Sequence, residues 1–364
     1  MAAVVRFRDL SVPPPERAEL LAAIDAVLTD GQIILGAAVE DFEAAFADAC
    51  GKRFCVGVSD GTGSLYLALR VLGIGKGDEV IVPAMSWVAT ANAVIATGAT
   101  PVFADVDDDY NLDPDAAEAA ITPRTRALMP VHFYGRMARM SALLAIARRS
   151  SLHVVEDASQ AFGACLDGKP AGAFGELAGF SLNPMKPLAA LGEAGATVTN
   201  DPDQAEALRS LRYLGTVNRE TCVDPSLNFK IDTLQAVILR HRMRRVAQIV
   251  ERRNAIARRY NEALADVVTV PRIPTDGVSA FFDYTIWCAD RDRLERTLNT
   301  AGIEVKVRHR ELLSEQPGYQ PAVCADLSNA QRLVAGILCL PIHEALSEAD
   351  QERVIAAIRA FYGS

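Results

Sequence analysis

Residues 54–72 of this 364-residue chain read FCVGVSDGTGSLYLALRVL. The first five residues predict a strand, the next six predict a turn around Gly61 and Gly63, and the last eight predict a helix that ends at Gly73. Glycines let the backbone approach a ligand closely, and the free amides at a helix start favour an anion such as phosphate. The stretch matches neither the Walker pattern nor G-x-G-x-x-G, so an ordinary turn between a strand and a helix remains the alternative.

The same alternation of strand and helix patterns continues to about residue 200. It predicts an α/β fold with a mostly parallel, doubly wound sheet. A long helical pattern over Asp232–Leu264 then leads towards a smaller α+β domain, with strands expected at Tyr284–Ala289 and Ile303–Val307. We place the large domain at residues 1–245 and the small C-terminal domain at 246–364, with an N-terminal segment able to pack on the small domain.

The chain opens with a proline-rich segment at residues 12–15. Proline is favoured at the first positions of a helix, and the apolar residues that follow recur with helical spacing. The expected apolar face of this first helix consists of Leu20, Leu21, Ile24, Val27 and Leu28.

An acid and a lysine stand out further along the chain. The run LHVVED at residues 152–157 predicts a central parallel strand that ends in Asp157, where open α/β sheets bind ligands. An acid that caps the next helix is the alternative. Lys186 lies between Pro184 and Pro187 in an apolar setting, which excludes a regular helix. A desolvated lysine has a lowered pKa and is a good nucleophile, whereas a surface loop lysine is the ordinary alternative.

These three features together indicate pyridoxal phosphate chemistry. This cofactor needs an amine that forms an imine with its aldehyde, an anion that keeps its ring nitrogen protonated, and donors for its phosphate. Lys186, Asp157 and the turn at residues 59–64 offer these groups in that order.

Five motifs occur in the order found in one known family. They are SDGT at 59–62, PAMSWVATAN at 83–92, VHFYG at 131–135, EDASQA at 156–161, and Ser181 five residues before Lys186. With them the chain resembles the DegT/StrS-type sugar aminotransferases over almost its whole length. The resemblance implies an aspartate-aminotransferase-like fold of type I, pyridoxal 5′-phosphate as cofactor, and a keto sugar or keto cyclitol as acceptor.

The resemblance also assigns roles around the cofactor ring. Lys186 is the imine lysine and Asp157 the partner of the ring nitrogen. Gln160 is expected to bond the phenolic oxygen, and Trp87 to stack on the ring with its wide face.

The phosphate and the substrate are assigned in the same way. Gly61, Thr62 and Ser181 are expected to hold the phosphate. Asn228 is expected to reach it from a neighbouring subunit, which implies a homodimer with shared active sites. The expected substrate residues are Asn183, His309 and Tyr319. A lysine at position 186, where some relatives carry histidine and dehydrate sugars, indicates transamination.

Composition limits the other possibilities. The net charge is −9, and no apolar run approaches the length that a membrane span needs, so we expect a cytoplasmic protein that binds neither membrane nor nucleic acid. Seven scattered cysteines without a C-x-x-C pair favour free thiols over disulfides or a metal site. Eight arginines between Arg240 and Arg259 could suggest nucleic-acid binding, but they occupy several helix faces, which favours a solvated or intersubunit helix.

Three functions therefore compete at this stage. The first is an aminotransferase of amino-sugar or antibiotic biosynthesis that uses glutamate, or glutamine, as donor, with a sugar dehydratase of the same fold as its variant. The second is an NAD-dependent oxidoreductase, which the missing fingerprint disfavours. The third is a regulator that binds the cofactor without catalysis, since fold alone does not determine function.

Overall fold

The structure is a computed structural model that describes residues 4–363. Within that range the largest sheet has eight strands in the order β1-β9-β8-β5-β4-β2-β3-β14. Their bounds are β1 (Phe54–Val58), β9 (Gly195–Thr199), β8 (Leu177–Ser181), β5 (His153–Asp157), β4 (Thr125–Leu128), β2 (Glu79–Pro83), β3 (Thr100–Ala104) and β14 (Val323–Cys324). All neighbours pair in parallel except β9, which is antiparallel to β1 and to β8. The predicted mostly parallel sheet is confirmed.

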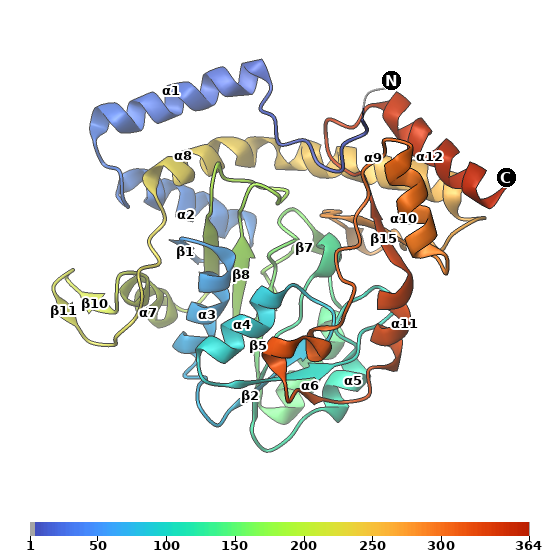
Figure 1. Ribbon diagram of the computed structural model, residues 1–364. Coiled ribbons are helices and arrows are strands. Elements are labelled where there is room, and N and C mark those ends of the chain that lie inside the picture. Colours follow the sequence, from blue (N-terminus) through green and yellow to red (C-terminus); the bar gives the residue numbers. More distant parts are fainter. Residues whose placement is uncertain (1–3, 364) are drawn as a thin grey trace.

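Helices cover both faces of this sheet (Figure 1). They are α2 (Ala37–Ala49), α3 (Gly61–Val71), α4 (Val88–Ala96), α5 (Pro114–Ala119), α6 (Met140–Ser150), α7 (Pro202–Arg212) and α8 (Thr233–Arg242). Side chains of a strand alternate between its two faces, so β1 contributes to two separate cores. Val56 and Val58 pack in the cluster that contains α3, whereas Cys55 packs in the cluster that contains Phe42 and Phe46 of α2. Burial on both faces explains the continuous apolar runs in the sequence.

The C-terminal part forms a third core. Its elements are α9 (Val246–Leu264), β13 (Tyr284–Trp287), α10 (Arg291–Thr300), β15 (Ile337–Leu340) and α12 (Glu348–Tyr362), and β13 pairs antiparallel with β15. The N-terminal segment joins this unit, because Val5 N donates to Gly302 O at 2.9 Å and Val5 bridges Ile303. The domain boundary at 245/246 stays a prediction. It falls where the 3-10 turn η2 (Met243–Arg245) meets α9.

Three expectations are corrected. The helical pattern over Asp232–Leu264 is interrupted by η2, and the expected strand Ile303–Val307 is reduced to isolated bridges at Ile303 and Lys306. β14 and α11 (Ser328–Gly336) fall within residues 246–364, which we assigned to the small domain, but they pack on the large unit: β14 pairs with β3, and Ala330 in α11 belongs to the same core as β1. Pairing partners from elsewhere in the chain decide these features, so local patterns could not show them.

The first helix, α1 (Pro14–Asp30), runs along the outside of the molecule beside α8 (Figure 1). Leu20 and Val27 are buried, but Leu21 and Leu28 are 58% and 61% exposed. Only half of the apolar face predicted for this helix is therefore buried within the chain. The other half of this face is exposed and available to a partner surface.

The remaining elements are short. They are β6 (Cys165–Leu166), β7 (Lys169–Pro170), β10 (Thr216–Val217), β11 (Thr221–Cys222), β12 (Gly277–Val278), and the 3-10 turns η1 (Phe133–Gly135), η3 (Leu313–Glu315) and η4 (Pro317–Tyr319).

The arginine-rich segment is used for packing within the chain. Arg242 and Arg245 both pair with Glu16 of α1, and Arg253 in α9 pairs with Glu344. None of the helices between residues 4 and 363 is both long and apolar enough to span a bilayer. The expected cytoplasmic location stays a prediction.

Candidate active site

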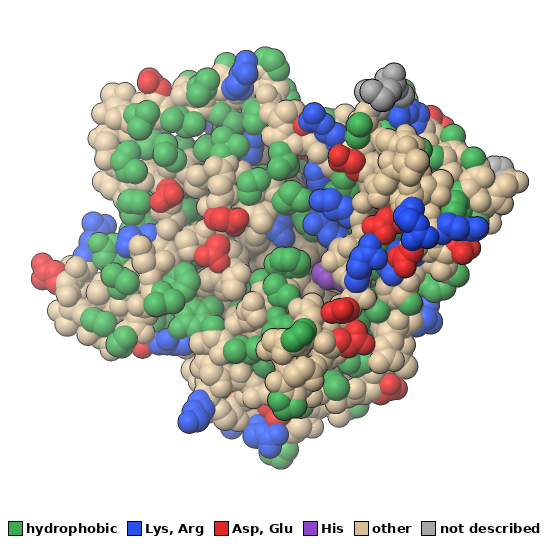
Figure 2. Space-filling model, viewed as in Figure 1, with side chains coloured by type: hydrophobic (Ala, Val, Ile, Leu, Met, Phe, Trp, Pro, Cys, Tyr) green, Lys and Arg blue, Asp and Glu red, His purple; other side chains and the backbone are tan. Residues whose placement is uncertain are grey.

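A cavity of about 710 Å³ opens at the C-terminal ends of the central strands. Figure 2 shows that this face of the molecule is hollowed near its centre, with Lys or Arg side chains and a histidine at the rim. The structure brings nine of the predicted residues into the cavity wall: Gly61, Thr62, Trp87, Asp157, Gln160, Ser181, Asn183, Lys186 and His309. Asn228 and Tyr319 do not line it.

One end of the cavity has the features of an anion site. The carboxylate of Asp60 caps α3 by accepting from Gly63 N at 2.8 Å. The amides of Gly61 and Thr62 have no acceptor among the described residues. A Cβ at Gly61 would lie 2.5 Å from Cβ of Ser181, so only glycine fits between the turn and β8. Two free amides at a helix start, beside the hydroxyls of Thr62 and Ser181, fit a phosphate group.

Asp157 ends β5 at the floor of the cavity and is only 3% exposed. Thr90 Oγ1 donates to its Oδ2 at 2.7 Å, and Ser159 N donates to its Oδ1 at 3.1 Å. Thr90 in turn contacts Ser86 Oγ at 2.7 Å. No helix begins directly after β5 in the described chain, so Asp157 is not a helix cap. Its carboxylate is held rigidly in the cavity wall.

Gln160 is oriented by a neighbouring loop. Tyr134 N donates to Gln160 Oε1 at 2.7 Å, which assigns this atom as the acceptor and leaves the amide nitrogen free to donate. Gln160 lines the cavity, so this nitrogen is available to an oxygen of a bound group.

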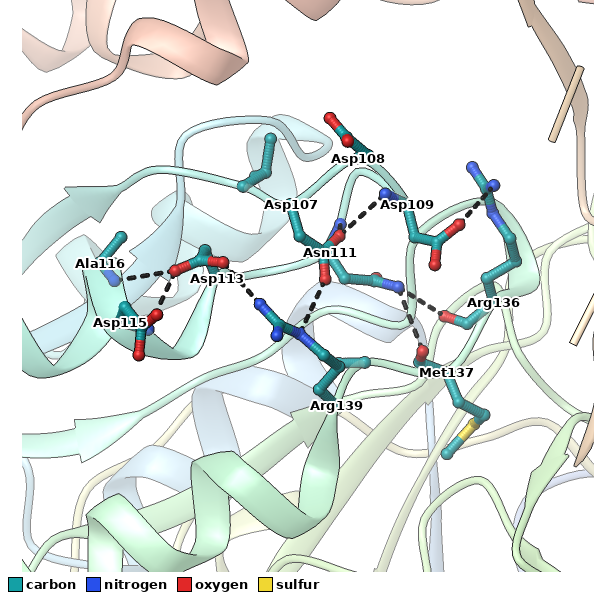
Figure 3. A network of polar contacts seen from close by, with 12 residues as sticks. Asp107, Asp108, Asp109, Asn111, Asp113, Asp115, Ala116, Arg136, Met137 and Arg139 are labelled. Carbon is teal, nitrogen blue, oxygen red and sulfur yellow. Dashed lines mark hydrogen bonds and ion pairs between the residues drawn. The ribbon is translucent and has the colours of Figure 1, made fainter. Parts of the chain in front are cut away.

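A polar network holds that loop in place (Figure 3). Asn111 Nδ2 donates to the carbonyls of Arg136 and Met137 at 3.3 and 3.2 Å, and its Oδ1 accepts from Phe133 N at 2.9 Å. The guanidinium of Arg136 lies 3.4 Å from Asp109. The loops that follow β3 and β4 thereby position Gln160 through the backbone at residues 133–134.

Trp87 precedes α4 at the mouth of the cavity and is 59% exposed. A tryptophan this exposed leaves a large apolar face in water. A flat aromatic ligand in the cavity would cover this face by stacking.

Lys186 lies in the cavity wall on a turn that Asn183 holds. Lys186 N donates to Asn183 O, and Met185 N donates to Asn183 Oδ1, both at 3.0 Å. The ammonium lies 4.6 Å from the ring centroid of Phe282. Burial lowers the pKa of Lys186 to about 8, although the charges of Asp157 and Asp283 oppose this shift. A lowered pKa makes the neutral, nucleophilic amine accessible near neutral pH.

This pKa predicts how cofactor-free protein reacts with pyridoxal phosphate. Only the neutral amine bonds to an aldehyde, so the rate of bond formation should rise with pH and level off above about pH 8. An exposed lysine would keep gaining reactivity towards about pH 10.4. Stopped-flow absorbance across this pH range measures the rate, and a rise that continues up to pH 10 would contradict the buried setting of Lys186.

The other two substrate candidates differ in position. His309 lies against Phe133, with ring centroids 5.2 Å apart, and burial lowers its pKa to about 4. Its imidazole is therefore neutral at pH 7 and can donate or accept a hydrogen bond. Tyr319 instead donates to Asn92 Oδ1 at 2.9 Å, outside the cavity wall. Its assignment to the substrate finds no support in this geometry.

Among the cavity residues that the sequence did not indicate, four contact or electrostatically influence Asp157 or Lys186. They are Thr90, Phe282, Asp283 and Arg308. Thr90 stands in a motif that we quoted, four residues after Ser86, and this helical spacing was a usable signal. The other three come from the C-terminal part and carried no local pattern.

Fold and site define the class. A mostly parallel sheet with a glycine turn, a buried acid and a lysine around one cavity at its strand ends is typical of aspartate-aminotransferase-like proteins of fold type I. The chain belongs to the DegT/DnrJ/EryC1/StrS aminotransferase family, whose sequence model matches residues 14–359. The family model and the relatives below are those of aminotransferases, so the enzyme class is amino-group transfer and the oxidoreductase alternative has no support. Aminotransferases of this family depend on pyridoxal phosphate, and one similar solved structure, 29% identical to this chain, carries the bound cofactor PMP.

Individual relatives agree with this assignment. The dTDP-3-amino-3,4,6-trideoxy-alpha-D-glucose transaminase of Streptomyces venezuelae is 41% identical over 98% of this chain and 95% of its own length. The UDP-2-acetamido-2-deoxy-3-oxo-D-glucuronate aminotransferase of Pseudomonas aeruginosa is 36% identical over 93% and 94%. The crystal structure of S. venezuelae DesV in complex with a ketimine intermediate is similar with a TM-score of 0.96 and 40% identity, covering both chains fully.

Proposed function

We propose that the protein transfers an amino group from an amino acid to the keto group of a nucleotide-linked sugar, with pyridoxal phosphate in the 710 Å³ cavity. One observation carries the proposal: the amine of Lys186, the carboxylate of Asp157 and the free amides of Gly61 and Thr62 all open into this one cavity. The relatives named above act on dTDP- and UDP-linked sugars, which supports a nucleotide-linked acceptor.

Each residue has a physical task in this proposal. When bound, pyridoxal phosphate supplies an aldehyde that carries the amino group and a ring that withdraws electrons. The amides of Gly61 and Thr62 bind its phosphate, and Gln160 donates to its phenolic oxygen. Asp157 favours the protonated ring nitrogen. Lys186 Nζ moves a proton from the substrate carbon, because its lowered pKa lets it accept and release protons near neutral pH.

The acceptor can be tested directly. The aminated holoenzyme is mixed with dTDP-, UDP- and GDP-linked keto sugars and with free keto cyclitols, and the absorption of the bound cofactor is followed. We expect one class of nucleotide-linked keto sugar to restore the original spectrum. Restoration by free cyclitols alone would overturn the nucleotide-linked acceptor, and tight cofactor binding without reaction would favour a regulator.

The donor is tested in the other direction. Glutamate and glutamine are added separately to the holoenzyme, and the aminated form is measured. We propose glutamate as the donor. If only glutamine produces the aminated form, glutamine is the donor instead. Loss of a hydroxyl from the sugar instead of gain of an amino group would indicate the dehydratase variant.

We also propose a homodimer in which Asn228 completes the partner's phosphate site. Asn228 is exposed and lies outside the cavity of its own chain. Large apolar side chains stand exposed near it and on α1: Leu21, Leu28, Leu214, Val217, Val223 and Leu227. Large apolar side chains exposed on both segments favour a protein interface there, and a two-fold interface would exchange each Asn228 between the two sites.

Subunit exchange tests the shared site. Lys186→Ala and Asn228→Ala are each expected to be inactive or strongly impaired. A mixed dimer would contain one site with both lesions and one site with neither, so activity should partly return. Exchange is verified by two affinity tags, and two Lys186→Ala subunits serve as the control. Demonstrated exchange without recovery would place each site within one chain.

A further inference from the structure

A buried acid holds two arginines beside the lysine of the cavity. The side chain of Asp283 is fully buried. Arg8 Nη2 lies 2.6 Å from its Oδ1, while Arg308 Nε and Nη2 donate to Oδ2 and Oδ1 at 2.9 and 3.2 Å. Arg8 also donates to the carbonyls of Phe282 and Ile342. Three distant segments thus meet at one carboxylate.

The charges in this cluster do not balance. One carboxylate faces two guanidinium groups. Of the other cations nearby, Arg253 is paired with Glu344, and Lys186 interacts with both Asp157 and Asp283. A buried excess of positive charge is costly unless an anion compensates it. Arg308 uses only its Nε and Nη2 edge for Asp283, and its Nη1 has no partner among the described residues. Arg308 lines the cavity, so this free nitrogen is available to a ligand there.

Arg308 and Lys186 lie around the same ring in the wall of one cavity. Arg308 Cζ is 5.3 Å and Lys186 Nζ 4.6 Å from the ring centroid of Phe282, and burial together with the charge of Arg308 lowers the pKa of Lys186. In amino-group transfer, the nitrogen of the donor takes the place of this lysine amine. The α-carboxylate of an amino acid is attached to the carbon that bears that nitrogen. A keto sugar has no ionised group beside its reacting carbon.

We propose that Arg308, oriented by Asp283 and backed by Arg8, binds the α-carboxylate of the amino-acid donor. This inference rests on the proposed aminotransferase function and assigns its donor subsite. A guanidinium fixed in one plane matches a carboxylate better than a mobile ammonium does. The shared acid sets that plane before the donor arrives, which reduces the ordering cost of binding.

The decisive experiment varies the arginine and the carboxylate together. Holoenzymes with Arg308 and with Arg308→Gln react with L-glutamate and with 4-aminobutanoate, which is glutamate without its α-carboxylate. We expect the substitution to weaken apparent glutamate binding about 10- to 100-fold, the scale of a charged hydrogen-bonded pair. Reaction with 4-aminobutanoate should change little. The half-reaction with the keto sugar should keep its apparent affinity.

Two further variants exclude a folding defect. Arg308→Lys keeps the charge without the planar fork, so its apparent affinity for glutamate should lie between those of the unmodified enzyme and Arg308→Gln. Circular dichroism and Tm verify that each variant is folded. Arg332→Gln is the matched control, because Arg332 is an exposed arginine paired with Asp108 outside the cavity wall. This control should behave as the unmodified enzyme.

The outcomes separate this inference from the function on which it rests. Equal losses with glutamate and 4-aminobutanoate would overturn the α-carboxylate assignment, and a loss confined to the keto-sugar half-reaction would assign Arg308 to the acceptor instead. If no amino acid reacts at all, the proposed function fails. Calorimetric titration with glutarate, which has carboxylates but no amine, then tests the anion site without any reaction. Equal glutarate affinity of the unmodified enzyme and of Arg308→Gln would overturn the anion site.

Discussion

Replacing Lys186 with alanine is expected to lower kcat by about 10⁴-fold or more, because one amine serves as both nucleophile and proton carrier. The glycine turn at residues 59–64, which we propose as the phosphate site, does not depend on this side chain: the amides of Gly61 and Thr62 and the hydroxyl of Ser181 remain in place. The variant should therefore still bind pyridoxal phosphate, with lower affinity. The measurements are steady-state turnover and equilibrium dialysis of the cofactor.

Chemical mapping identifies the reactive lysine independently of turnover. Borohydride reduction of the holoenzyme followed by peptide mapping should place the pyridoxyl group on Lys186. Lys169, which is exposed beside the ring of Phe174, provides the control, and Lys169→Ala should retain full activity. A pyridoxyl group found on Lys169 or Lys230 would refute the assignment of Lys186.

The Asp157→Asn substitution is expected to lower kcat by about 10²- to 10³-fold, the scale on which loss of one preorganised electrostatic partner acts. Asparagine preserves the shape and can keep hydrogen bonds to Ser159 N and Thr90 Oγ1. Only the negative charge opposite the ring nitrogen disappears. Cofactor affinity should fall less than kcat, and single-turnover kinetics separate the two effects.

Thr90→Val is the matched control for this prediction. It removes the hydrogen bond to Asp157 Oδ2 while the charge stays, so the loss should be much smaller than for Asp157→Asn. Near-normal turnover of Asp157→Asn would show that the acid only holds the turn at Ser159. Equal losses in both variants would mean that orientation of the carboxylate matters more than its charge.

Local sequence patterns predicted the framework of the site. The strand that ends at Asp157, the glycine turn at residues 59–64 and the lysine turn at 183–187 are each set by neighbouring residues, and each stands where its pattern placed it. Asp60 caps α3 and Asn183 holds the lysine turn within three residues of their partners. Short-range hydrogen bonds and side-chain alternation depend on local order, so they could be read along the chain.

Long-range packing decided the rest. The hydrogen bond from Thr90 to Asp157 spans 67 residues, and that from Arg8 to Asp283 spans 275. Tertiary contacts also decided that Leu21 and Leu28 stay exposed on α1 and that β14 joins the large sheet. The sequence by itself determined where the glycine turn, the strand that ends at Asp157 and the lysine turn lie, because these features form locally. Only the tertiary structure decided which charges surround Lys186, because burial and electrostatic fields depend on residues that meet solely in the folded chain.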